Sequence, residues 1–123
     1  MSKLKKVYLT QGKEIFDDIE SVDMVISTKA CSPAKKWCIE LEMNDVWGLY
    51  KAWKKNPMFS LHIKYSSSMG GVQSLCETVT GEVMIVSIQI DKVSKKPYTV
   101  MGYSNNLNFS SKEQFVREKV QFT

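Results

Sequence analysis

The sequence predicts an α+β domain: a mostly antiparallel sheet or small barrel of about five to six strands, with two to three short helices. Three observations lead to this prediction. Several segments alternate strictly between apolar and polar residues, other segments place apolar residues at helical spacing, and the prolines and glycines fall mainly between these segments. The 123 residues predict one globular domain covering residues 1–123.

The predicted strands rest on alternation with a period of two, which puts one set of side chains on a buried face. Residues 36–43 show it most clearly, with apolar residues at every odd position from Trp37 to Met43. The segment 83–90 is apolar at most positions, which is typical of a central strand covered on both sides. Further strands are predicted over 6–9, 22–26, 59–65 and 98–103.

A helix is predicted from Asp45 to Lys55, with Asn44 as its N-cap. Lys54 and Lys55 suit its C-terminal end, where the helix dipole favours cations. Its apolar residues recur at helical spacing and are expected to face the core. They are Val46, Leu49, Tyr50 and Trp53.

Two further helices are expected. Residues 13–21 place Ile15, Phe16 and Ile19 on one face of a short amphipathic helix. Near the C-terminus, the spacing of Ser110 and Glu113 fits a capping box, which predicts a helix from Ser111 to about Lys119.

Residues 72–80 fit either a helix or a strand. Their apolar spacing suits a helix, but the threonines and valine near the end of the segment favour a strand. Gly81 is expected to end whichever element forms there.

The charge pattern indicates a lysine-rich solvated surface. The net charge is +4, and Arg117 is the only arginine. Arginine supplies the planar fork that reads guanine edges, so this composition argues against a sequence-specific DNA reader. No apolar run is long enough to span a bilayer, and no signal peptide is apparent, so we expect a cytoplasmic protein, in the host cell if the protein is viral.

Residues for catalysis or metal binding are few. His62 is the only histidine, and Cys31, Cys38 and Cys76 are not spaced in the close pairs that zinc motifs use. A Cys–His pair would need distant strands to become neighbours. We therefore expect a protein that is not an enzyme and that holds neither a metal nor a cofactor.

One stripe of the predicted helix, made of Trp47, Lys51, Lys54 and Lys55, lies away from its core face, and Lys64 on the next strand would extend it. A tryptophan among lysines suits an acidic protein surface, where Trp is a preferred anchor. It equally suits single-stranded nucleic acid, whose bases stack on aromatic rings. In a third interpretation, Trp47 bends back into the core and the lysines are merely solvated.

A Ser/Gly-rich loop offers a weaker candidate site. Its glycines would let the backbone approach a phosphate-bearing small ligand closely, although the loop lacks the Gly-Lys-Ser/Thr of a Walker motif. The alternative is a plain hairpin connection. The loop residues concerned are Ser67, Ser68, Gly70 and Gly71.

Taken together, these patterns favour a small binding protein that docks its Trp/Lys surface onto a macromolecular partner. A protein partner is the first expectation, nucleic acid the second, and a small phosphorylated ligand the third. By analogy, a viral or mobile-element inhibitor or accessory protein would have this character. The sequence leaves the oligomeric state open.

Overall fold

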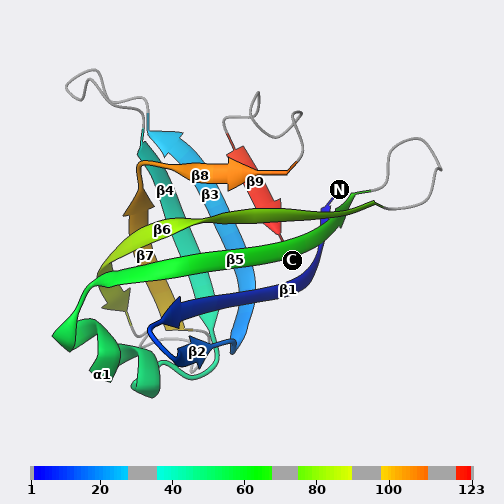
Figure 1. Cartoon of the computed structure of the whole chain (residues 1–123). Coiled ribbons are helices and arrows are strands. Elements are labelled where there is room, and N and C mark those ends of the chain that lie inside the picture. The colour runs from blue at the N-terminus through cyan, green and yellow to red at the C-terminus, as the bar shows by residue number, and fades with distance from the viewer. Residues whose placement is uncertain (1, 28–35, 68–74, 90–97, 111–118, 123) are drawn as a thin grey trace.

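The protein folds as an antiparallel sheet with one helix in the part of the chain that is described (Figure 1). The computed structural model describes residues 2–27, 36–67, 75–89, 98–110 and 119–122. The strands are β1 (Ser2–Gln11), β2 (Glu14–Phe16), β3 (Ile19–Ser27), β4 (Lys36–Met43), β5 (Met58–Ser67), β6 (Leu75–Gln89), β7 (Tyr98–Ser104), β8 (Leu107–Phe109) and β9 (Lys119–Phe122), and the helix is α1 (Trp47–Lys55).

The nine strands form a single sheet in the order β2-β1-β5-β6-β7-β4-β3-β9, and β8 pairs with β6. The sheet curls on itself, because β1 also contacts β3 and β9 from the other end of this order. Figure 1 shows the result as two layers, with β1, β5 and β6 crossing in front of β3, β4 and β7. The helix α1 lies at one end of these layers, beside β2 and the start of β5.

The predicted fold class is therefore wrong. The structure is an all-β-like fold with nine strands, where α+β with five to six strands was expected, and the described residues contain one helix where two to three were expected. The predicted strands are present, and most of them run further than predicted. Three short strands, β2, β8 and β9, were not predicted at all.

The predicted helix over 13–21 is replaced by a hairpin between β1 and β2. Gln11 pairs with Glu14, which leaves a two-residue turn. Gly12 has a φ of 60°, and no non-glycine residue described has a positive φ, a combination that matches a type II′ turn. Ile15, expected on the buried face of a helix, is 64% exposed on the short strand.

The helix expected from Ser111 to about Lys119 lies almost wholly outside the described residues, whereas the described part of 72–80 forms a strand, one of the two alternatives for that segment. Residues 111–118 and 72–74 are not described, while Lys119 begins β9 and residues 75–80 belong to β6. Ser110 extends the pairing of β8 with β6: its N–H donates to the carbonyl oxygen of Thr78 at 2.9 Å, and its Oγ accepts from the Thr78 N–H at 2.7 Å. Ser110, which was expected to cap a helix, therefore forms hydrogen bonds to a strand of the sheet instead.

Gly81 does not end an element, since β6 runs through it. A Cβ at this position would lie 2.6 Å from both the Asn106 carbonyl oxygen and Leu107 Cδ2. The absence of a side chain therefore allows Asn106 and the first residue of β8 to lie close against β6, with which β8 pairs antiparallel. Further along β6, an irregularity in the pairing with β7 falls between Ile85 and Ser87 and leaves Val86 as an extra residue.

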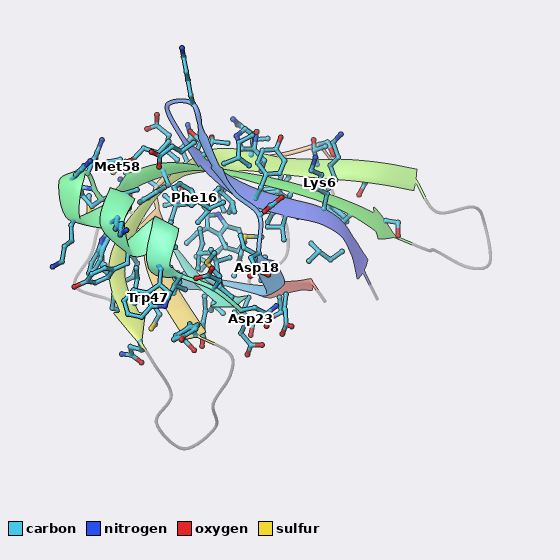
Figure 2. The ribbon with its side chains drawn as sticks, turned by 90° about the horizontal axis from the view of Figure 1, so that it is seen from below. Lys6, Phe16, Asp18, Asp23, Trp47 and Met58 are labelled. Carbon is cyan, nitrogen blue, oxygen red and sulfur yellow. The ribbon has the colours of Figure 1, made fainter. Side chains whose placement is uncertain are left out.

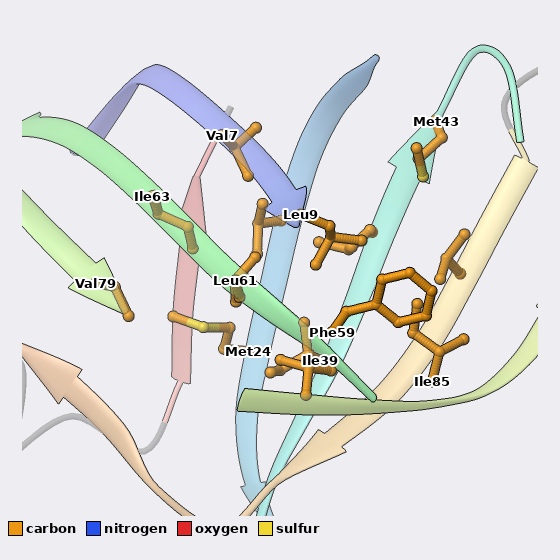
Figure 3. Packing of buried hydrophobic residues seen from close by; sticks show 14 of the residues in the cluster. Val7, Leu9, Met24, Ile39, Met43, Phe59, Leu61, Ile63, Val79 and Ile85 are labelled. Carbon is orange, nitrogen blue, oxygen red and sulfur yellow. The ribbon is translucent and has the colours of Figure 1, made fainter. Parts of the chain in front are cut away.

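The core fills the space between the two layers (Figure 3). Leu9 and Leu61 from the front layer and Met24 from the back layer are fully buried there. The strict alternation predicted for residues 36–43 is confirmed, since β4 buries Ile39, Leu41 and Met43. No helix in the described segments is long and apolar enough to cross a membrane.

Candidate partner-binding surface on α1

The start of α1 is fixed by short polar contacts. The Trp47 N–H donates to Asp45 Oδ1 at 3.1 Å, and the Tyr50 N–H makes the first helical bond, to the Val46 carbonyl oxygen at 2.7 Å. Asn44 was predicted to be the N-cap of α1, but Val46 occupies that position. The Asn44 backbone N–H and side-chain Nδ2 donate instead to the carbonyl oxygen and Oδ1 of Asp18, at 3.2 and 3.3 Å, which ties the residues before α1 to the β2–β3 connection.

The inner side of α1 is fixed to the sheet. Leu49 and Ala52 are buried, and the Trp53 indole Nε1 donates to the Ile85 carbonyl oxygen at 2.8 Å. A Cβ on Gly48 would lie 3.7 Å from Phe16, so the ring from β2 packs close to the helix backbone. The helix orientation is therefore set by contacts with both β2 and β6.

Trp47 lies on the opposite side of α1 and is 60% exposed (Figure 2). Its ring meets the Tyr50 ring edge-on, with centroids 6.4 Å apart, and Tyr50 in turn contacts Trp53 at 6.1 Å. The Lys54 Nζ lies 4.8 Å from the Tyr50 ring centroid, within cation–π range. A line of three aromatic rings thus runs from the sheet contact of Trp53 to the exposed indole of Trp47.

A shallow pocket of about 220 Å³ lies beside these rings. Val46, Trp47, Tyr50 and Ile88 line it, so its walls are apolar and come from both α1 and β6. The sequence predicted the outward position of Trp47 but gave no sign of the pocket, because Ile88 is distant in the chain. The pocket could receive an apolar side chain of a partner.

Exposed lysines accompany these rings on α1. Lys51, Lys54 and Lys55 are all exposed, and α1 contains no acidic residue that could pair with them along the helix. Lys54 and Lys55 also lie in the last turn, where they complement the helix dipole. The surface formed by Trp47, Tyr50, Lys51, Lys54 and Lys55 is called the α1 surface below.

Lys64 does not belong to the α1 surface. It lies six residues beyond Met58 on β5, about 20 Å away at the rise of a β-strand. Its register partners are Lys6 on β1 and Thr78 on β6, and Figure 2 shows Lys6 well separated from Trp47. The prediction that Lys64 extends the stripe on α1 relied on its closeness in sequence to the helix, and it is wrong because β5 leads away from α1.

Most of the Ser/Gly-rich loop lies outside the described residues. Ser67 belongs to the end of β5, whereas Ser68, Gly70 and Gly71 lie outside the described residues. The expectation that this loop binds a phosphorylated ligand stays a prediction.

His62 and Cys38, two of the residues considered for catalysis, lie in different surroundings. The His62 ring stacks on Tyr8 with centroids 4.7 Å apart, and its Nε2 lies 3.3 Å from Thr10 Oγ1. Cys38 carries a free, half-buried thiol on β4. Within the described segments, no three His, Cys, Asp or Glu side chains come together in a way that could hold a metal ion.

Comparisons with known proteins add no relative. The chain matches no protein-family model, and neither a curated protein nor a solved structure is detectably similar to it.

Proposed function

We propose that the protein is a binding protein that uses the α1 surface to dock onto an acidic surface of a larger protein. The observation that carries this proposal is the exposure of Trp47, 60% of whose side chain faces solvent beside an apolar pocket. Large aromatic residues contribute most of the binding energy in many interfaces when a partner covers them. An indole left in water at the start of a fixed helix is suited to that role.

The lysines support an acidic partner. Lys51, Lys54 and Lys55 are exposed on α1, and the Lys54 ammonium group lies 4.8 Å from the centroid of the Tyr50 ring. Charges at the rim of an interface steer the encounter and select the partner more than they add affinity. The arrangement of an apolar centre with a charged rim also matches the general anatomy of protein interfaces.

Single-stranded nucleic acid is the second candidate, because the exposed Trp47 ring could stack on a base next to the same lysines. The single arginine of the chain favours the protein partner, since phosphate recognition commonly uses bidentate arginine contacts. The two candidates differ in their salt dependence.

The proposal is tested by quantitative co-purification from cells that express tagged protein. Trp47→Ala and the Lys51→Glu/Lys54→Glu double variant should both lose a partner that the unaltered protein retains. Lys64→Glu is the matched control, because Lys64 is exposed but lies about 20 Å along β5 from the end of α1. A partner retained equally by all the variants would show that the α1 surface does not bind it.

A further inference from the structure

The pocket beside Trp47 has the size of a site for a single side chain. Its volume is about 220 Å³, and Val46, Trp47, Tyr50 and Ile88 line it. Pockets for small-molecule ligands are usually larger, about 300–1,000 Å³. The lining residues that the structure describes carry no charge, so the pocket favours an apolar group.

The charge changes sign along α1. Lys51 and Lys54 follow Trp47 by about 6 and 11 Å along the helix axis. The Lys54 Nζ lies 4.8 Å from the ring centroid of Tyr50, which is itself a wall of the pocket. At the other end of the helix, Asp45 is exposed and its Oδ1 accepts the Trp47 N–H. The C-terminal end of α1 therefore attracts carboxylates, and the N-terminal end repels them.

Two more exposed carboxylates lie beside the N-terminal end of α1. Asp17 and Asp18 form the connection from β2 to β3, and Asp18 Oδ1 accepts a hydrogen bond from Asn44 Nδ2. A broad acidic surface laid over α1 would meet these carboxylates as well as the lysines. Like charges brought together in an interface weaken binding. A narrow acidic segment that lies over the lysines alone avoids this repulsion.

The α1 surface is also small. The nine residues of α1 give a helix about 14 Å long. Interfaces between folded proteins usually cover roughly 800 Å² and roughly 20–30 residues on each side. The pocket and the α1 surface together comprise seven described residues, four that line the pocket and three lysines. This area suits a peptide segment better than a second folded domain.

We propose that the α1 surface binds a short acidic segment of the partner, which places one aromatic or large aliphatic side chain in the pocket beside Trp47 and its carboxylates over Lys51 and Lys54. Because the charge of α1 changes sign near Trp47, the carboxylates lie on one side of the apolar residue only. In an extended segment they follow or precede it by about two to four residues, since a strand advances about 3.3 Å per residue. This assignment rests on the proposed function and narrows the protein partner to one that exposes such a segment.

The test is selection from a displayed library of random peptides against the unaltered protein. The enriched peptides should share one aromatic or large aliphatic residue, with acidic residues on one side of it. Selection against Lys51→Glu/Lys54→Glu should enrich basic residues in place of the acidic ones, and selection against Trp47→Ala should enrich no common sequence. Lys64→Glu is the control and should enrich the same peptides as the unaltered protein, because Lys64 lies away from α1.

A second measurement changes only the peptide, so it does not depend on how the variants fold. The affinity of an enriched peptide is measured by the fluorescence anisotropy of a label on the peptide. Replacing its apolar residue by alanine, or its acidic residues by lysine, should weaken binding by about tenfold or more. An affinity that either change leaves intact would overturn the proposal.

The selection also separates this proposal from the proposed function. No enriched sequence, or an enriched sequence without acidic residues, would overturn the acidic segment. If a co-purified protein were still lost in Trp47→Ala, the proposed function would stand and the partner would bind through a folded surface. If every co-purified protein were retained in Trp47→Ala as well, both would fail.

Discussion

The Trp53 indole donates a hydrogen bond to the Ile85 carbonyl oxygen at 2.8 Å, and this contact joins α1 to β6. The N–H of the same Ile85 donates to the Pro57 carbonyl oxygen at 2.9 Å. One residue of β6 therefore holds both the helix and the connection from the helix to β5. The α1 surface is presented by a helix fixed at the point where β6 begins its irregular pairing with β7.

The first prediction separates the structural tryptophan from the exposed one. Trp53→Phe removes the hydrogen bond to Ile85 and should lower the free energy of unfolding by about 1–2 kcal/mol. Trp47→Phe should change it by less than about 0.5 kcal/mol, because Trp47 is mostly exposed. Urea titrations of both variants give the two free energies of unfolding. Equal destabilisation would contradict the described contact of Trp53 with β6.

The second prediction concerns the close approach of the start of β8 to Gly81 on β6. In Gly81→Ala, the new Cβ would lie 2.6 Å from the Asn106 carbonyl oxygen, which cannot move without distorting the strand. We expect a loss of about 1–3 kcal/mol in stability. In the control Gly48→Ala, the nearest atom outside the helix is at 3.7 Å, so alanine should stabilise α1 by roughly 0.5–1 kcal/mol. Thermal unfolding should therefore shift in opposite directions for the two variants.

The sequence was most informative where a strand has one clearly buried face. The alternation over residues 36–43 identified β4, and helical spacing identified α1 to within two residues of its start. It failed over residues 13–21, because the spacing of Ile15, Phe16 and Ile19 suits a helix as well as two short extended segments. The turn at Gly12, which decides between them, depends on the pairing of β1 with β2.

Long-range contacts explain the remaining differences. Gly81 is a typical strand terminator in sequence, and only the approach of β8 explains a glycine inside β6. The same applies to the candidate sites. The outward stripe of α1 could be predicted from helical spacing, but the pocket with Ile88 depends on the position of β6 in the sheet. Register cannot be obtained from local patterns alone.

The third prediction tests the core between the two layers. Leu61 is fully buried on β5, so Leu61→Ala should cost about 2–5 kcal/mol in stability through lost burial and the cavity left behind. Ile15→Ala is the matched control, because Ile15 is 64% exposed on β2, and it should cost less than about 1 kcal/mol. A similar loss in both variants would mean that the inner face of β5 is not the core.

The fourth prediction separates the two candidate partners of the α1 surface through salt. If Lys51, Lys54 and Lys55 each contacted a phosphate, the logarithm of the binding constant for a single-stranded oligonucleotide would fall with a slope of about −2 against the logarithm of salt concentration. A protein interface centred on Trp47 should depend on salt less steeply, since its central contacts are apolar. Fluorescence titration with oligothymidine, comparing the unaltered protein with Trp47→Phe, follows the indole directly. We expect little quenching at physiological salt. Strong quenching with the steep slope, lost in Trp47→Phe, would instead assign the α1 surface to nucleic acid.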